Sequence, residues 1–263
     1  MNQGRRSPND IWVCHLGTIP YRDALAMQLD IAARRHGGEL PDTLLLLEHP
    51  PVYTRGRRSQ PGELTLGEEF YRARGIEVVP TDRGGRVTYH GPGQLVGYPI
   101  MGTTDVVAHL RTIEDAIVAA LAEEGIAAHS RPHYGPNYTG VWVQEHKIAS
   151  LGVHVSRGVS THGFAVNIEN DLEPFGWVVA CGLPDVEMTS IAAELERDGG
   201  GAACPRTTFS CFRKRVAYHF CEAHGRRQRL VSPRRLGIDA PVAALSWRAP
   251  ITLAHRPPAG VLA

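Results

Sequence analysis

The chain has 263 residues, of which 43% are hydrophobic and 21% are charged, and its formal net charge is +1. A chain of this length can bury a full hydrophobic core without disulfides or structural metals. Its net charge is too small to create an overall electrostatic field that would favour nucleic acid or a membrane as the partner. The five cysteines show no CxxC spacing, which argues against a disulfide scaffold or a zinc site and indicates a reducing compartment.

No targeting or membrane segment is visible in the sequence. Arg5 and Arg6 are followed by Ser7 and Pro8 rather than by a sustained apolar run, which argues against a secretory signal. No stretch approaches the ~20 consecutive apolar residues that a membrane span requires. We therefore expect a cytoplasmic protein.

The first hundred residues alternate between apolar runs and turn residues. Tyr21 to Arg35 has helical spacing, with Leu25, Leu29 and Ala32 on one stripe, and residues 67–74 could form a short helix. Apolar runs bounded by turn residues predict strands at 11–17, 43–48, 77–80 and 87–89.

The second half predicts two long helices around a group of strands. The helices are expected at 106–124, where Gly125 ends the pattern, and at 207–223. The strands are expected at 140–143, 148–155 and 164–168. Strands that cluster between helices without a steady βαβ rhythm indicate an α+β layered domain.

Two segments lie outside this pattern. Residues 197–206, with Gly199 to Gly201, are typical of a flexible loop, and from about Arg226 the chain becomes rich in Arg, Pro and Ala. We expect this tail to wrap the surface or to be partly disordered. Its arginines, and the group Arg55, Arg57 and Arg58, are either solvated faces or a landing patch for an acidic protein.

The segment from Arg83 to Leu95, RGGRVTYHGPGQL, is the most unusual one. Its four glycines and one proline are typical of a tight hairpin. Its polar residues Thr88, Tyr89, His90 and Gln94 argue for a site, because such side chains are costly near a core unless they have partners.

Two further residues allow a chemical interpretation. Lys147 begins an apolar strand pattern, where a lysine is usually solvated but can also be a charge held beside a pocket. Cys181 is followed by Gly182, Leu183 and Pro184, which indicates a loop, and catalytic groups often lie on loops. A lone cysteine is nevertheless more often a small core residue.

The other cysteines and the histidines give weaker signals. Cys14 lies in the first expected strand, and Cys211 and Cys221 lie in the last expected helix, so we expect all three to pack in the core. Cys204 falls in the glycine-rich loop. Four histidines allow a catalytic role, but no spacing pairs any of them with Cys181: His49, His133, His154 and His162.

Together these segments resemble the lipoyl(octanoyl) transferases of lipoate biosynthesis, the octanoyl-carrier-protein:protein N-octanoyltransferases. The resemblance spans residues 11–225. It rests on RGGRVTYHGPGQLVGYPI from Arg83, KIASLGVHV from Lys147, THGFAVNI from Thr161 and ACGLPDVEMTSI from Ala180, in the same order and spacing.

The resemblance implies the fold of biotin- and lipoate-protein ligases, a mixed, mostly antiparallel sheet flanked by helices. A catalytic domain over residues 1–225 would then precede a basic tail over 226–263. Cys181 would carry the acyl thioester, and Lys147 would lower the pKa of its thiol. The implied substrate-binding residues are Arg83, Gly84, Gly85, Arg86, Val87, Thr88, Tyr89, His90, Ser150, Leu151, Gly152, Gly163, Phe164 and Ala165.

The implied reaction moves an octanoyl group from octanoyl-acyl carrier protein to a lysine ε-amine on a lipoyl domain. The acceptors would be lipoyl domains of 2-oxoacid dehydrogenase complexes and the glycine cleavage H protein. No cofactor, metal or ATP is expected, because a thioester is already activated. Two alternatives stay open at this point: an ATP-dependent ligase on the same fold, and a binding module without catalysis.

Overall fold

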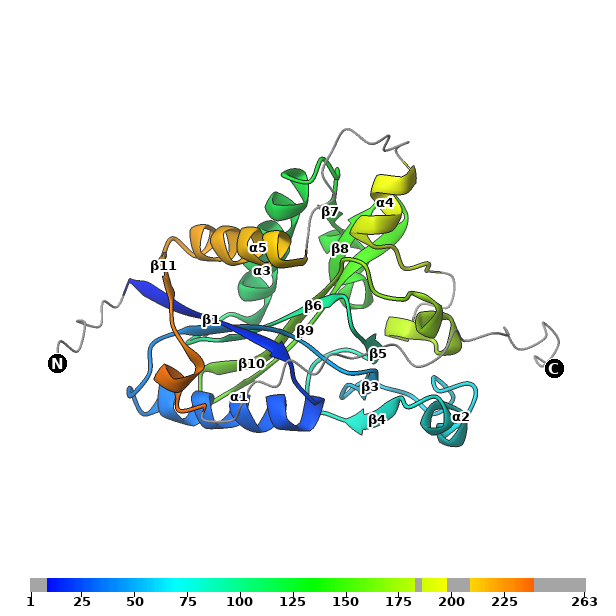
Figure 1. Ribbon diagram of the computed structural model, residues 1–263, viewed down its shortest axis with the longest axis horizontal. Coiled ribbons are helices and arrows are strands. Elements are labelled where there is room, and N and C mark those ends of the chain that lie inside the picture. The colour runs from blue at the N-terminus through cyan, green and yellow to red at the C-terminus, as the bar shows by residue number, and fades with distance from the viewer. Residues whose placement is uncertain (1–8, 183–185, 198–208, 239–263) are drawn as a thin grey trace.

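A mixed sheet runs through the part of the chain that the computed structural model describes, residues 9–182, 186–197 and 209–238 (Figure 1). Its eight strands lie in the order β11 (Arg227–Leu230), β1 (Asp10–Thr18), β2 (Thr43–Glu48), β6 (Gln94–Ile100), β10 (Val159–Asn167), β9 (His146–Ser156), β8 (Gly140–Val143) and β7 (His129–Ser130). β1 pairs in parallel with β11 and β2, and every other pairing in this sheet is antiparallel. The predicted mixed, mostly antiparallel sheet is confirmed.

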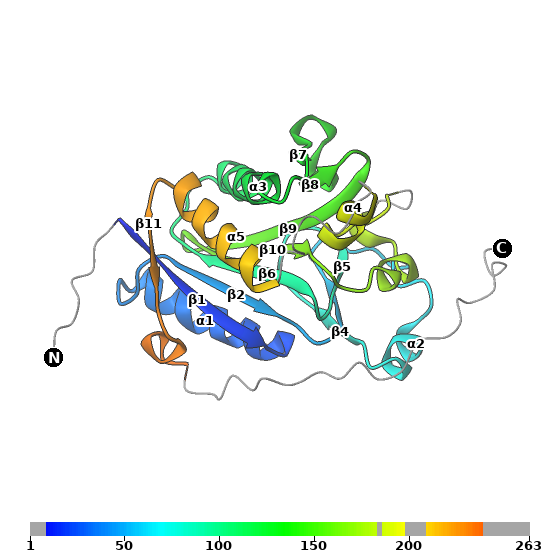
Figure 2. The same ribbon diagram turned by 45° about the horizontal axis from the view of Figure 1, so that its top comes forward.

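Helices cover both faces of this sheet. α3 (Val106–Ala122) and α5 (Phe209–Ala223) pack on one face, and α1 (Tyr21–His36) packs on the other (Figures 1 and 2). In β2, Leu44 and Leu46 face α3 and α5, whereas Leu45 and Leu47 face the side of α1. A strand that is covered on both faces reads as a continuous apolar run, which is why this strand could be predicted.

The chain also forms a second, three-stranded sheet. It contains β4 (Glu77–Pro80), β3 (Val52–Arg55) and β5 (Val87–His90) in that order. The shorter elements are α2 (Glu68–Ala73), α4 (Ile191–Arg197) and the 3₁₀ turns η1 (Pro132–Tyr134), η2 (Pro136–Tyr138), η3 (Glu173–Trp177), η4 (Ala180–Gly182) and η5 (Pro233–Leu236).

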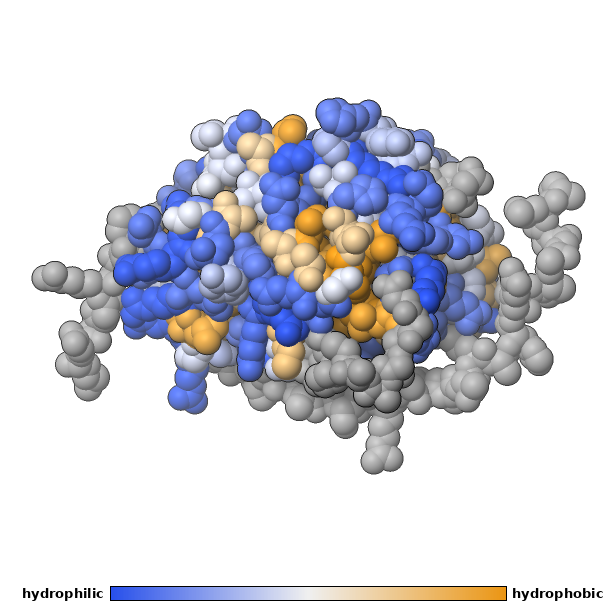
Figure 3. All heavy atoms as spheres, turned by 90° about the horizontal axis from the view of Figure 1, so that it is seen from above, coloured by the Kyte–Doolittle hydropathy of each residue, from blue (hydrophilic) through white to orange (hydrophobic). Residues whose placement is uncertain are grey.

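The surface on the side of α3 and α5 is mainly hydrophilic, with a group of hydrophobic residues near its middle (Figure 3). α5 turns its apolar side toward the sheet, because its buried residues Phe212, Val216 and Phe220 recur every four positions. Cys221 lies on the same buried face, as expected. Cys211 does not: it is exposed, and the expectation that it packs in the core is wrong because it falls off the apolar stripe.

The first residues of the expected tail, which was to begin at about Arg226, form the edge strand of the large sheet. Residues Arg227 to Leu230 form β11, which pairs with β1 from Asp10 to Val13. Two of its neighbouring arginines form ion pairs, Arg226 with Asp42 at 2.7 Å and Arg227 with Asp10 at 2.9 Å. The glycines at 199–201 lie outside the described residues. No described helix combines the length and apolar character needed to cross a bilayer.

Candidate active site

A cavity of about 240 Å³ is lined by β5 of the small sheet and by β6, β9 and β10 of the large one. Ligand pockets commonly measure ~300–1,000 Å³, so this one suits a small or narrow ligand. Thirteen of the residues predicted above line it: Arg83, Gly84, Gly85, Arg86, Thr88, His90, Lys147, Ser150, Leu151, Gly152, Gly163, Phe164 and Ala165. The fold therefore brings together three segments that are far apart in the sequence.

Two glycines in the wall are required by close backbone approaches. A Cβ at Gly163 would lie 2.2 Å from the carbonyl oxygen of Gly97 in β6. A Cβ at Gly152 would lie 2.6 Å from the carbonyl oxygen of Gly84. Any larger residue would push these segments apart, so both glycines keep the wall thin and the cavity closed on this side.

Arg83 holds the glycine-rich loop in place. Its guanidinium donates to the carbonyl oxygen of Thr54 at 2.7 Å, to Thr54 Oγ1 at 2.8 Å and to the carbonyl oxygen of Arg86 at 2.6 Å. The backbone N–H of Gly84 donates to Val153 in β9 at 3.1 Å. The loop is thus tied to both sheets and forms a fixed wall of the cavity.

β5 divides its side chains between two environments. Thr88 and His90 face the cavity, whereas Val87 and Tyr89 pack on the other side against an aromatic cluster that includes Tyr53. Successive side chains of a strand point to opposite faces, so a run of predicted site residues along β5 could not all reach the ligand. Val87 and Tyr89 support the wall from behind.

His90 is neutral and its hydrogen bonds are satisfied within the wall. Gln94 donates through Nε2 to the carbonyl oxygen of Tyr89 at 3.2 Å and to Asn167 Oδ1 at 2.9 Å, so its Oε1 accepts. His90 Nδ1–H donates to that Oε1 at 2.8 Å, which leaves Nε2 to accept from Thr54 Oγ1 at 3.4 Å. Burial lowers the pKa of His90 well below its ordinary value.

His49 supports the cavity from the second layer. It is fully buried, its Nδ1–H donates to the carbonyl oxygen of Ile19 at 2.6 Å, and its Nε2 accepts from the hydroxyl of Tyr98 at 2.6 Å. Burial lowers the pKa of His49 to about 4. Tyr98 lines the cavity with its ring while its hydroxyl is turned to His49.

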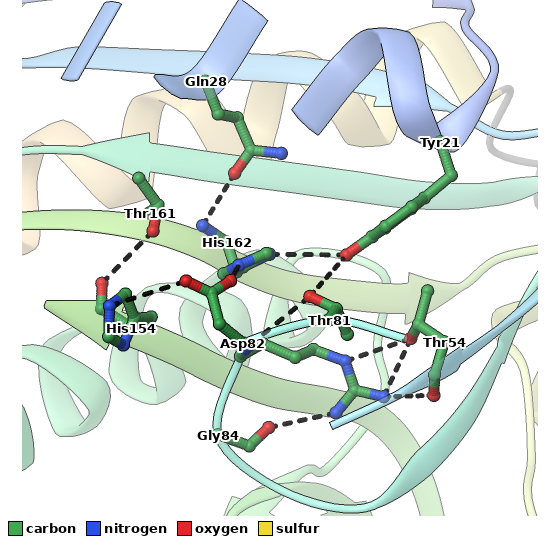
Figure 4. A network of polar contacts seen from close by, with 10 residues as sticks. Tyr21, Gln28, Thr54, Thr81, Asp82, Gly84, His154, Thr161 and His162 are labelled. Atoms are coloured by element: carbon green, nitrogen blue, oxygen red, sulfur yellow. Dashed lines mark hydrogen bonds and ion pairs between the residues drawn. The ribbon is translucent and has the colours of Figure 1, made fainter. Parts of the chain in front are cut away.

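A polar network closes the wall where β10 meets α1 (Figure 4). His162 is buried with a left-handed φ of 57°, and its Nε2 lies 2.7 Å from Asp82 Oδ1. Its Nδ1 lies 3.4 Å from the hydroxyl of Tyr21, and its backbone N–H donates to Gln28 at 2.7 Å. His154 reaches the other oxygen of Asp82 at 3.5 Å. The network fixes the residues that precede Arg83.

Lys147 is buried, with 1% of its surface exposed, although a lysine at a strand start is usually solvated. Its Nζ lies 5.3 Å from the ring centroid of Trp142, within reach of a cation–π interaction. Its backbone pairs with the segment that follows Cys181: Lys147 N–H donates to Glu187 at 3.0 Å, and Thr189 N–H donates to Lys147 at 3.0 Å.

Cys181 lies in η4, which contacts β5, and only its backbone is described. The next residue, Gly182, has a φ of 68°, and a Cβ there would lie 2.0 Å from a guanidinium nitrogen of Arg86. Arg86 is itself held by an ion pair with Glu63 at 2.8 Å. A fixed cation therefore lies against the backbone beside Cys181.

The remaining described cysteines are poor nucleophiles or lie elsewhere. Burial raises the pKa of Cys14 to about 11 and that of Cys221 to about 12. Cys211 is exposed on α5, and Cys204 lies outside the described residues. His133 lies in η1 and does not line the cavity.

Sequence reasoning missed several residues of the wall. They come from α1, α3, the 3₁₀ turns and the central strands, where neighbouring positions look like ordinary core or loop: Tyr21, Arg58, Val96, Tyr98, Val106, Leu110, Pro136, Asn137, Thr139, Val153 and His162. Among them, His162 was considered as a possible catalytic histidine and Arg58 as part of a basic group, but nothing in the local sequence of either residue indicated a cavity. Across the described residues, no three His, Cys, Asp or Glu side chains gather as a metal site would require.

Comparison with known proteins identifies the family. The family described as the lipoyl protein ligase A/B catalytic domain matches residues 20–220. The octanoyltransferase of Rubrobacter xylanophilus is 45% identical over 202 residues, covering 75% of this chain and 90% of that protein. The octanoyltransferase of Mycolicibacterium smegmatis is 42% identical over 232 residues, covering 85% and 93% of the two chains.

Solved structures agree on the fold. The crystal structure of lipoate-protein ligase A bound with ATP superposes with a TM-score of 0.67 at 17% identity, covering 83% of this chain and 87% of that chain. A putative lipoate protein ligase from T. acidophilum with bound lipoic acid superposes with a TM-score of 0.65, covering 85% and 89%. The sequence motifs, the sheet and these relatives agree, and the chain belongs to the octanoyltransferases of the lipoyl protein ligase A/B family.

Proposed function

We propose that this octanoyltransferase works through a thioester on Cys181, with Lys147 holding the thiolate. The observation that carries the proposal is the burial of Lys147 in the wall of the cavity. Burying an ammonium costs free energy unless the charge is paired or hydrogen-bonded, and a thiolate on Cys181 would be a suitable counter-charge. Its backbone is paired with residues 187–189, close in sequence to Cys181, which supports the pairing of the two residues.

The electrostatics of the cavity favour a thiolate. A free thiol has a pKa of ~8.5, and a nearby ammonium can lower it by about 1–3 units. Arg86 lies beside the backbone of Gly182 on the same side, but its ion pair with Glu63 offsets its charge, so Lys147 is the group that favours the thiolate. The resulting thiolate attacks the carbonyl of the octanoyl thioester and expels the carrier thiolate.

The second step releases the enzyme. The unprotonated ε-amine of an acceptor lysine attacks octanoyl-Cys181, loses one proton and forms the amide, and the Cys181 thiolate leaves. Because a thioester is converted to an amide, neither ATP nor another cofactor is required. This chemistry separates the proposal from the ligase route, in which a free acid must first be activated.

The cavity suits an acyl chain. Lys147 Nζ lies at Gly140, opposite Ser150, while the far wall contains Val153 and His162. Three residues of strand span ~10 Å. The seven C–C bonds of an octanoyl group, each about 1.5 Å long, extend in a zigzag over about 9 Å.

Two polar residues of this wall, His90 and Tyr98, do not oppose burial of the chain. His90 and Tyr98 bond to Gln94, Thr54 and His49, so the acyl chain meets their ring carbons. Burying about six methylenes contributes ~5 kcal/mol at ~0.8 kcal/mol each. The same estimate gives only about a fourfold difference in affinity for one methylene, so we expect neighbouring chain lengths to be accepted in part.

We infer that both substrates are carried on proteins: octanoyl-acyl carrier protein as the donor, and lipoyl domains of 2-oxoacid dehydrogenase complexes or the glycine cleavage H protein as acceptors. Arg58 lines the cavity, and Arg57 beside it is exposed. These charges support a docking role toward acidic carriers.

Intact-mass analysis after incubation with octanoyl-acyl carrier protein, without ATP, tests the proposal. We expect an octanoyl adduct on the wild type that disappears in Cys181→Ser and persists in the control Cys211→Ser. Lys147→Ala should slow adduct formation most at neutral pH and recover in part at higher pH. An adduct on Cys181→Ser would exclude this nucleophile, and a strict requirement for ATP with free octanoate would favour a ligase.

A further inference from the structure

Glu114 is a buried carboxylate that the reaction described above does not use. It lies on α3, its side chain is 0% exposed, and it forms an ion pair with Arg111 one turn earlier on the same helix. Burial raises the pKa of Glu114, while hydrogen bonds from Gly140 and Arg111 act in the opposite direction. A carboxylate in such a place is costly, so its contacts outside the helix deserve an explanation.

The contact outside the helix is with the first residue of β8. Glu114 Oε1 accepts the backbone N–H of Gly140 at 2.8 Å, and this hydrogen bond is buried. It joins α3 to the strand that pairs with the beginning of β9. This hydrogen bond therefore ties Gly140 to α3, in addition to its pairing with Ser150 of β9.

Gly140 in turn carries the side chain of Lys147. Its φ is 147°, and a Cβ at this position would lie 2.5 Å from Lys147 Cε and 3.2 Å from Lys147 Nζ. The end of the lysine thus occupies the space that any other residue at 140 would fill. The ring of Trp142 lies 5.3 Å from the same Nζ. The ammonium is held between the backbone of Gly140 and this ring.

We propose that Glu114 is a positioning residue for octanoyl transfer: by accepting the N–H of Gly140, it fixes the surface on which the ammonium of Lys147 rests. This inference rests on the proposed function of Lys147. Glu114 acts through Gly140 and Lys147 and touches neither substrate. Its loss lets β8 shift at Gly140 and moves the ammonium away from the place where it favours a thiolate on Cys181.

The thiol pKa of Cys181 is the sharpest readout, because it needs no turnover. It is measured from the pH dependence of alkylation by iodoacetamide, followed by mass on the peptide that contains Cys181. Lys147→Ala sets the largest expected rise, about 1–3 units. Glu114→Ala should raise the thiol pKa by part of this amount, about 0.5–1 unit, and Glu114→Gln, which keeps an acceptor oxygen, should restore most of the wild-type value.

The matched control is Glu124→Ala. Glu124 comes just after the end of α3, its side chain is 4% exposed, and it forms an ion pair with Arg215 of α5. We expect this variant to lose stability without a change in the thiol pKa of Cys181. The double variant Glu114→Ala/Lys147→Ala should match Lys147→Ala, because the first residue acts through the second.

Three outcomes would overturn the inference. In the first, Glu114→Ala folds and keeps the wild-type thiol pKa. In the second, the thiol pKa of the double variant is higher than that of Lys147→Ala. In the third, the thiol pKa of Glu124→Ala rises as much as that of Glu114→Ala. If Glu114→Ala does not fold, Glu114→Met fills the same buried space without an acceptor oxygen and should raise the thiol pKa; an unchanged value there also overturns the inference. If Lys147→Ala itself leaves the thiol pKa unchanged, the proposed Cys181–Lys147 pairing fails instead.

Discussion

At the scale of single residues, several polar side chains in the cavity wall and directly behind it are hydrogen-bonded to one another. His49 is the clearest example, because its two nitrogens bond to Ile19 and Tyr98 and leave no site for a proton. The neutral ring is part of the folded state, and protonation would break one of these hydrogen bonds. The fold therefore carries a built-in sensitivity to acid.

The sign of this effect follows from the two pKa values. The pKa of His49 is about 4 in the folded protein and ~6.5 when unfolded. Its contribution to stability is complete above pH ~6.5 and is lost as the pH falls toward 4, because only the unfolded chain binds the proton in that window. At pH 5 the loss amounts to about 2 kcal/mol.

The non-titrating variant His49→Gln isolates this contribution. The free energy of unfolding in urea is measured at pH 7.5 and pH 5 for both proteins, so that other buried histidines contribute equally. We expect the wild type to lose about 2 kcal/mol more than the variant between these pH values. Equal losses would show that His49 is not the acid-sensitive group.

At the scale of elements, the sequence predicted strands that bury both faces and helices with an apolar stripe. β2 and α3 are examples, since their patterns are set by burial against the sheet and are local. β11 could not be predicted, because three of its four residues are exposed at the edge of the sheet and its sequence, RQRL, is mostly polar. Its pairing with β1 depends on an element more than 200 positions away.

The candidate site shows the same division. Its sequence motifs could be assigned to a family. The burial of Lys147 could not be predicted, because it depends on Gly140 in a neighbouring strand and on Trp142. Val87 and Tyr89 were expected in the substrate site together with Thr88 and His90. The alternation of β5 separates the two pairs, and only the strand geometry reveals it.

The edge strand gives a prediction about where the folded unit ends. A chain truncated after residue 225 loses β11, the ion pair of Arg227 with Asp10 and that of Arg226 with the buried carboxylate of Asp42. We expect the free energy of unfolding to fall by about 2–5 kcal/mol or more, because a buried carboxylate loses one of its partners and the buried Leu236 of η5 is removed from the core. The matched control is a chain ending at residue 238, which keeps β11 and η5 and should be the more stable of the two truncations. Equal stability of the shorter and longer truncations would show that β11 adds nothing to the fold.

At the scale of the whole molecule, one wall of the cavity is also part of the surface. The segment with Arg57 and Arg58 runs along the glycine-rich loop: Arg57 N–H donates to Arg83 at 3.0 Å, and Arg58 N–H donates to Gly85 at 3.0 Å. Arg57 is exposed, and it lies next to Arg58, which lines the cavity. The arginines at 226–229, by contrast, lie at the β11 edge, where Arg226, Arg227 and Arg229 form ion pairs with Asp42 or Asp10.

This asymmetry predicts which basic cluster serves an acidic carrier protein. Arg57→Glu should raise the KM for octanoyl-acyl carrier protein roughly threefold or more at low salt, because a charge at the rim of an interface mainly changes the association rate. Turnover of a small octanoyl thioester should not change. In 1 M salt, where the Debye length is about 3 Å, the difference between variant and wild type should largely disappear.

Arg234→Glu provides the matched control, because Arg234 is an exposed arginine in η5, which lies beside β1 near the β11 edge of the large sheet. It reverses the same charge without approaching the cavity, so its KM for the carrier-bound substrate should stay at the wild-type value. If both variants raise KM equally, the effect reflects net charge and not a docking surface. If Arg57→Glu slows the small thioester as much as the carrier-bound one, the arginine acts on the cavity itself, and steering of the carrier is excluded.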